Sequence, residues 1–110
     1  MRIVSVVLGL LVAGFVSAAM AQATRMPPDP KAGHAIALRW CQTCHIVEEN
    51  QAHAVDSAPS FIDLARDSSL TPDVLRAFLH APKHPMPPLD LSSSQIEDLI
   101  AYIDTLKATK

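Results

Sequence analysis

Apolar and polar residues follow one another with the period of an α-helix through much of this chain. The clearest case is near the C-terminal end, where the apolar residues Ile96, Leu99, Ile100, Ile103 and Leu106 share one helical face. Just before them, Ser92 and Gln95 have the spacing of a capping box, in which each side chain bonds the other residue's backbone N–H. We therefore predict a helix that begins just after Ser92.

Three segments upstream show the same period. Asp29 and Pro30 form a helix start signal, and the apolar positions that follow predict a helix over about 30–44. Residues 61–65 suggest a short helical stretch, and Thr71-Pro72-Asp73 begins a helix that we expect to reach His80. No segment alternates as a strand does, so the predicted fold class is all-α.

Two connecting segments lack this pattern. Residues 46–60 have weak periodicity and read as a loop. Residues 81–90 contain four prolines, which fix φ and remove backbone donors, so we expect no regular element there.

The first residues have the layout of a secretory signal peptide. Arg2 precedes a mostly apolar run, and small residues follow in A-x-A arrangements that end at Ala21 and at Ala23. We predict a leader over 1–21, with a cut after Ala21 or Ala23, and one domain over 22–110 in the periplasm. An uncleaved membrane anchor remains the alternative, because the apolar run with its small residues nearly reaches the length of a spanning helix.

The composition limits the classes of function and partner that this chain can have. The chain has 110 residues, a formal net charge of −2 and only five per cent aromatic residues. It has no long basic run, so we expect no nucleic-acid partner. We also expect no stable membrane insertion once the leader is removed. So small a core commonly needs a disulfide, a metal or a large cofactor. Two cysteines three residues apart cannot join distant loops, which points to a cofactor.

The motif Cys41-Gln42-Thr43-Cys44-His45 is C-x-x-C-H, the attachment signature of haem c. On a helix, positions i, i+3 and i+4 share a face, so both thiols can reach one porphyrin while the imidazole of His45 lies under the iron. We predict one haem c held by two thioethers from Cys41 and Cys44. A thioredoxin-type thiol pair, a zinc site and a plain disulfide are the alternatives.

Downstream of His45 the chain has one methionine, Met86, set between Pro85 and Pro87. A thioether suits ferrous iron, and the prolines stiffen the loop that would present it, so we expect Met86 as the second axial ligand. Met86 could instead be a gap-filling core residue. The rival ligands are His53, His80 and His84.

From about Asp29 to Leu106 the chain resembles the class I mono-haem c-type cytochromes, in particular the short bacterial periplasmic ones. The motif C-x-x-C-H and the stretch MPPLDLSSSQIEDLIAYIDTL carry this resemblance. It implies a small cytochrome c fold, in which roughly three to five helices surround one haem and the N- and C-terminal helices cross.

The resemblance also implies roles for single residues. Gly33 corresponds to the glycine at the helix crossing and Tyr102 to the aromatic residue that packs there. Pro59 corresponds to the proline whose carbonyl accepts a hydrogen bond from the axial histidine, and Met86 to the distal ligand. Each could be an ordinary helix, loop or core residue instead. Many members have an aromatic residue where this chain has Ala37, so the crossing is looser or Trp40 compensates.

These features together predict an electron-transfer protein rather than an enzyme. It would pass one electron at a time, as a free shuttle or as the cytochrome subunit of a periplasmic dehydrogenase. A haem enzyme or gas sensor with an open distal site is the alternative. Expected partners are a periplasmic dehydrogenase, a terminal oxidase or a membrane cytochrome complex, met in small transient contacts. Lys31, Arg39 and Lys83 are candidates to edge the haem crevice, or merely solvated side chains. The expected haem packing residues are Ile36, Phe61, Leu64, Phe78, Leu79, Leu89 and Leu99.

Overall fold

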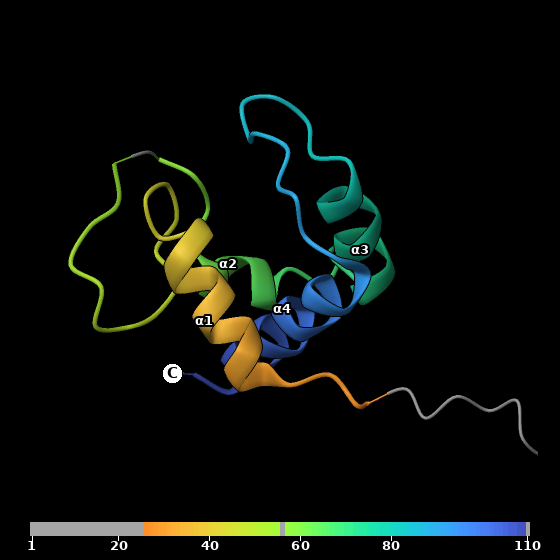
Figure 1. Ribbon diagram of the computed structural model, residues 1–110. Coiled ribbons are helices and arrows are strands. Elements are labelled where there is room, and N and C mark those ends of the chain that lie inside the picture. Colours follow the sequence, from red (N-terminus) through yellow and green to blue (C-terminus); the bar gives the residue numbers. More distant parts are fainter. Residues whose placement is uncertain (1–25, 56, 110) are drawn as a thin grey trace, which may run out of the picture.

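The computed structural model describes residues 26–55 and 57–109. The predicted leader, with Ala21 and Ala23, lies outside the described residues. The elements are α1 (Pro30–Trp40), α2 (Phe61–Arg66), α3 (Pro72–His80), α4 (Ser93–Thr105) and the 3-10 turn η1 (Leu106–Ala108). The described part of the chain contains helices and loops and no strand, which confirms the all-α class (Figure 1).

The helices begin where the sequence places their caps. The Asp29 side chain accepts a hydrogen bond from the Lys31 backbone N–H at the start of α1. At the start of α4, Ser92 and Gln95 form the predicted reciprocal capping box. These bonds satisfy N–H groups that the first helical turn leaves without a partner, so each start is encoded locally.

Helix α1 ends at Trp40, whereas the sequence predicted a helix to Cys44. The carbonyl oxygen of Ala37 accepts hydrogen bonds from both Cys41 N (2.9 Å) and Gln42 N (3.0 Å). The second bond spans five residues instead of four and breaks the helical pitch. The residues 41–44 therefore form a separate turn, in which His45 N donates to Cys41 O over 2.9 Å.

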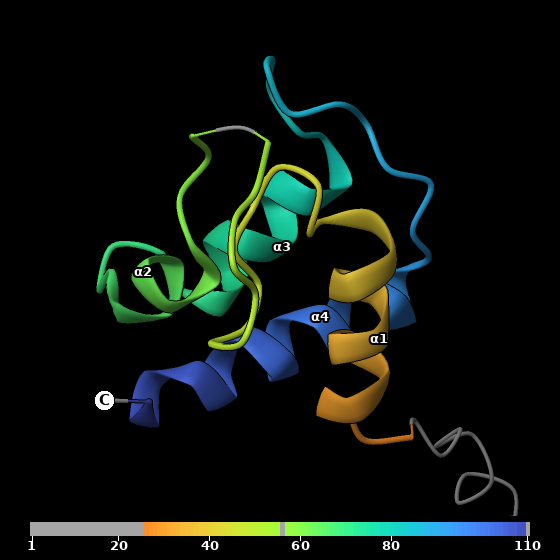
Figure 2. The same cartoon turned by 90° about the vertical axis from the view of Figure 1, so that its left-hand side faces the viewer.

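Helices α1 and α4 cross in close contact, as both views show (Figures 1 and 2). The close approach depends on Gly33: a Cβ added there would lie 1.9 Å from the backbone oxygen of Asp98 and 2.8 Å from Cβ of Tyr102. No side chain fits at such a distance, so α4 passes directly over the backbone of α1.

At this crossing Tyr102 has an aromatic partner, His34, which was not predicted from the sequence. The ring of His34 lies against that of Tyr102, with centroids 4.8 Å apart. Ala37 is completely buried, and Trp40 lines a cavity elsewhere with 53% of its surface exposed. The crossing is therefore tight without an aromatic residue at Ala37.

The core joins all four helices and one loop. Its residues with almost no exposed surface include Ile96 and Leu99 of α4 and Val47 in the loop after α1. The Arg76 guanidinium of α3 forms an ion pair with Glu97 of α4, which joins the two helices, and a second ion pair with Asp73 within α3. Within the described residues, no helix has the length and apolar character to cross a bilayer.

Candidate functional site

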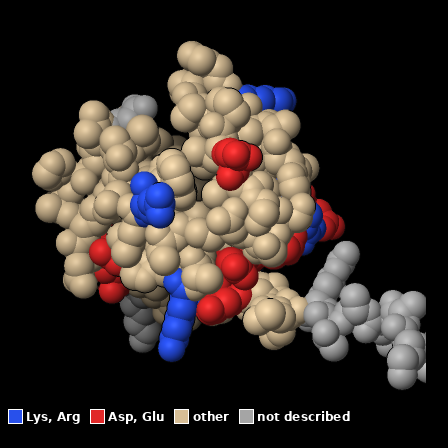
Figure 3. Space-filling view, in the orientation of Figure 1, with Lys and Arg blue, Asp and Glu red and all other residues tan. Residues whose placement is uncertain are grey.

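A cavity of about 520 Å³ opens between the end of α1, the turn after it, α2, α3, α4 and the proline-rich segment 81–90. Its volume falls in the range of cofactor sites. Figure 3 shows the surface hollowed between the part formed by α1 and the part formed by α3, with mostly uncharged residues around the hollow. The apolar side chains on its wall are Trp40, Ala58, Phe61, Leu64, Leu75, Phe78, Leu79, Leu89, Leu99 and Ile103.

Most of the packing residues expected from the sequence lie on this wall. The exception is Ile36, which packs against the helical core instead. The wall also includes Trp40, Leu75 and Ile103, which were not predicted as haem packing residues, although Leu75 and Ile103 belong to apolar helix faces that the sequence shows. Periodicity identifies an inward face, but it does not say which residues of that face meet a cavity.

The cavity wall carries the groups that the sequence analysis assigns to haem c. Cys41, Cys44 and His45 come from the turn that follows α1, and Met86 comes from the proline-rich segment. No carboxylate lines the cavity, and Lys83 is its one lining residue with a permanent charge. An apolar wall with thiols, an imidazole and a thioether matches the face and the bonding positions of haem c. The residues present therefore fit this cofactor.

No disulfide joins Cys41 and Cys44, so both sulfur atoms are available for thioether bonds. Burial raises the pKa of the Cys41 thiol to about 11, and the neighbouring Cys44 adds to the rise. A thiol–disulfide oxidoreductase needs a cysteine whose pKa is lowered, so that the thiolate forms near neutral pH. The environment of Cys41 acts in the opposite direction and argues against that function.

The ring of His45 is oriented by the loop before α2. Its Nδ1 lies 2.6 Å from the carbonyl oxygen of Pro59. A carbonyl only accepts, so Nδ1 must carry the proton that makes this bond, and Nε2 keeps its lone pair when the ring is neutral. The ring also lies against Phe61, with centroids 5.5 Å apart. The imidazole is thus in the tautomer that can bind a metal through Nε2.

Two of the four candidates for the distal ligand, Met86 and His84, line the cavity. Met86 is half-buried on the cavity wall, and its backbone N–H donates to Lys83 O over 3.1 Å. His84 also lines the cavity, whereas His53 and His80 do not. Of the expected rim cations, Lys83 lies on the wall, and Arg39 instead covers the Trp40 ring at 5.1 Å.

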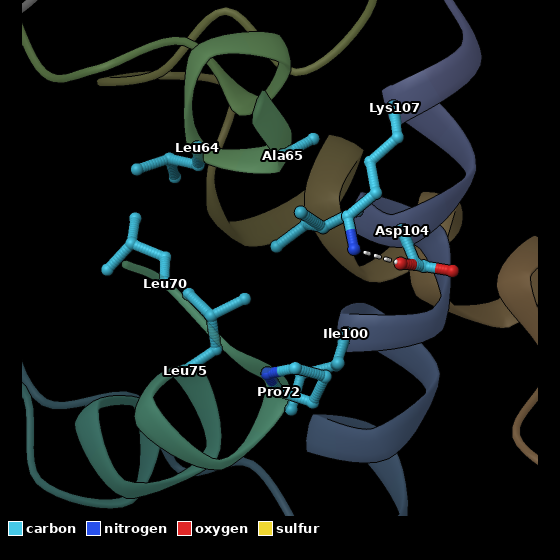
Figure 4. A pocket seen from close by; sticks show the side chains of 9 residues that line it. Leu64, Ala65, Leu70, Pro72, Leu75, Ile100, Asp104 and Lys107 are labelled. Carbon is cyan, nitrogen blue, oxygen red and sulfur yellow. Dashed lines mark ion pairs between the residues drawn. The ribbon is translucent and has the colours of Figure 1, made fainter. Parts of the chain in front are cut away.

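A second hollow lies between α2, α3 and the end of α4, beside the ion pair of Asp104 and Lys107 (Figure 4). Its volume of about 10 Å³ is barely enough for one water molecule. Within residues 26–55 and 57–109, no three His, Cys, Asp or Glu side chains gather as metal ligands. A zinc site, which needs four ligands, therefore finds no support in that part of the chain.

The chain also matches known proteins. Residues 28–103 match the family described as "Cytochrome C oxidase, cbb3-type, subunit III". The chain is similar to cytochrome c-552 of Bradyrhizobium diazoefficiens, with 35% identity over 89 residues, which cover 81% of this chain and 86% of the relative.

Two solved structures share the fold. The c-type cytochrome SorU from Sinorhizobium meliloti has a TM-score of 0.55 at 22% identity, over 70% of this chain and 88% of its own. Cytochrome c6 from the diatom Phaeodactylum tricornutum has a TM-score of 0.51 at 25% identity, over 68% of this chain and 90% of its own. The protein belongs to the family described as "Cytochrome C oxidase, cbb3-type, subunit III" and is a small class I mono-haem c-type cytochrome with covalently bound haem c and an electron-carrier role.

Proposed function

We propose that this protein carries single electrons in the periplasm through a haem c that His45 and Met86 ligate. The observation that supports this most is the shared cavity: one apolar chamber is lined by both thiols of the C-x-x-C-H motif, by the imidazole and by one thioether. When bound, haem c supplies an iron that takes up and releases one electron.

In this proposal Cys41 and Cys44 form the two thioether bonds, and His45 binds the iron through Nε2. The Pro59 carbonyl fixes the ring of His45 by accepting the Nδ1–H bond, which also strengthens the imidazole as a donor. The apolar wall, with Phe61 and Leu99 among its residues, keeps water away and disfavours the additional positive charge of the ferric state.

Met86 is the proposed distal ligand. The prolines on each side of it restrict the backbone, so little conformational freedom is lost when the thioether is held in place. A thioether opposite a histidine favours ferrous iron and raises the reduction potential. A filled distal position leaves no open coordination site for a gas or a peroxide, which separates this proposal from a haem enzyme or a gas sensor.

The cavity wall also bears on the partner. Lys83 is the one wall residue with a permanent charge, so a partner that docks at the haem edge would meet a basic side chain there. The matched family takes its description from an oxidase subunit, which supports a terminal oxidase among the candidate partners. A periplasmic dehydrogenase or a membrane cytochrome complex would contact the same face.

Absorption spectra of the oxidised and reduced protein test the proposal. The chain with its leader is expressed in a host that attaches haem c, and the periplasmic fraction is collected. We expect haem that stays bound on denaturing gels and in acid acetone, a weak far-red ferric band typical of His/Met ligation, and no rapid carbon monoxide binding. A high-spin ferric spectrum with fast carbon monoxide binding would support the open-site alternative. Co-purification with a larger enzyme would distinguish a subunit from a free shuttle.

A further inference from the structure

The side chain of Gln51 lies within hydrogen-bond distance of four backbone atoms around the C-x-x-C-H turn, and the two N–H groups of its Nε2 are shared among three carbonyl oxygens. Its Oε1 accepts from Val47 N at 2.9 Å. Its Nε2 lies 2.8 Å from Gln42 O, 2.8 Å from His45 O and 3.2 Å from His53 O. One amide therefore ties the turn to the loop that follows it.

Gln51 completes the anchoring of His45. The backbone N–H of His45 donates to Cys41 O, and its ring Nδ1 donates to Pro59 O. Its backbone carbonyl accepts from the Gln51 side chain. The residue is thus held at three points: its backbone on both sides of Cα, and the ring itself. Only the bond at the carbonyl comes from another residue's side chain.

Val47, two residues after His45, is also held through its backbone groups. Its side chain has no exposed surface, and its backbone carbonyl accepts from the Tyr102 hydroxyl at 2.6 Å. Its N–H is the group that donates to Gln51. A buried backbone group without a partner is costly, so both side chains stabilise the loop. Only Gln51, however, also contacts the backbone of His45.

We propose that Gln51 is a positioning residue for the axial histidine, and that it sets the reduction potential through His45. This inference rests on the proposed ligation by His45. If Gln51 holds the His45 backbone in place, it also holds the ring at the distance that the Pro59 bond requires. Without Gln51 that bond weakens, the imidazole becomes a poorer donor, and ferric iron loses stabilisation relative to ferrous iron.

The test compares Gln51→Met with the unchanged holoprotein, since methionine keeps the length of the side chain and removes the amide with all of its hydrogen bonds. We expect a higher reduction potential. At a fixed external potential, the ferric-to-ferrous ratio falls about threefold, less than the tenfold or more that follows loss of a direct partner of a ligating histidine. In the diamagnetic ferrous protein, the Nδ1 proton of His45 exchanges with solvent several-fold faster. If Gln51→Met yields no holoprotein, Gln51→Glu replaces it, because it keeps the acceptor for Val47 N and loses the donors.

Two controls separate positioning from mere stability. Tyr102→Phe removes the hydroxyl bond to Val47 O and loosens the same loop without touching His45, so we expect a lower unfolding midpoint and an unchanged potential. Asn50→Ala changes the exposed neighbouring amide, and we expect no effect on either quantity. An unchanged potential and proton exchange in the Gln51 variant, or an equal shift in Tyr102→Phe, would overturn the inference. If the unchanged protein lacked His45 ligation, the proposed function itself would fail.

Discussion

The imidazole Nδ1 of His45 and the carbonyl oxygen of Pro59 lie 2.6 Å apart, although the two residues are fourteen positions apart in the chain. This bond joins the turn after α1 to the loop before α2, so the orientation of the ring is set by a second segment and not by the motif alone. The C-x-x-C-H motif supplies the bonding groups, and the tertiary structure supplies their direction.

Replacing Met86 tests the distal ligand. Met86→Ala removes the thioether, so we expect the weak far-red ferric band to disappear and the reduction potential to fall as water or a histidine takes its place. His84 is the nearest rival in the chain, because it also lines the cavity. Absorption spectra and potentiometry measure both effects.

Met26→Leu is the matched control for this variant. Met26 is 90% exposed and lies before α1, so its replacement should leave the spectrum as it is. A far-red band that survives in Met86→Ala would assign the distal position to another residue.

Removing both thiols tests how much of the core depends on the cofactor. In Cys41→Ala/Cys44→Ala nothing can form the thioethers, and the 520 Å³ cavity has no covalently held occupant. We expect little folded protein, because a cavity of this size forfeits the burial that a small domain requires. Circular dichroism and denaturant titration measure this. A stable, cooperative domain without haem would contradict the expectation.

At the helix crossing, a glycine-to-alanine substitution should lower the free energy of unfolding instead of raising it. Glycine to alanine inside a helix ordinarily adds about 1 kcal/mol of stability. Gly33→Ala should instead cost about 1–3 kcal/mol, because its methyl group would overlap the backbone of Asp98. Denaturant unfolding measures the difference. Ala35→Gly on the exposed side of α1 is the control and should show only the ordinary propensity loss.

The helices of this protein could be predicted closely because their starts are local. Ser92 and Gln95 lie within one turn of each other, and the bonds between them form in the structure as the spacing indicates. The end of α1 could not be predicted in this way. It depends on two N–H groups that share the carbonyl oxygen of Ala37, and no residue type marks that geometry.

The sequence predicted those site residues whose type indicates their chemical role. The cysteines, the histidine and the methionine can be recognised as candidate haem ligands from their residue types and spacing. Gln51 cannot, since a glutamine in a loop of weak periodicity resembles a solvated side chain. Val47 was missed for a similar reason: it is fully buried in that same loop, and a single apolar residue has no periodicity.

The single tyrosine gives a prediction for alkaline pH. Burial raises the pKa of Tyr102 above its ordinary value of 10.0, and the charge of Glu48 raises it further. Above pH 10 the unfolded chain releases this proton while the folded protein keeps it. The stability that Tyr102 contributes is therefore complete below pH 10 and is lost as the pH rises through the pKa of the folded state.

Two measurements check this. The free energy of unfolding should fall more steeply above pH 10 in the unchanged protein than in Tyr102→Phe, which has no such proton. The ultraviolet absorption of tyrosinate should appear at a higher pH in the folded protein than in denaturant. Equal slopes for the two proteins would show that the phenol titrates normally.

The passage of α4 over Gly33 has a consequence for how the molecule is made. The first helix of the domain finds its main contact in the last one, so the interior closes only after nearly the whole chain has been synthesised. An unfinished chain contains α1 without α4, so α1 has no helix to pack against and the core does not form. The last helix to be synthesised is therefore the one that completes the interior.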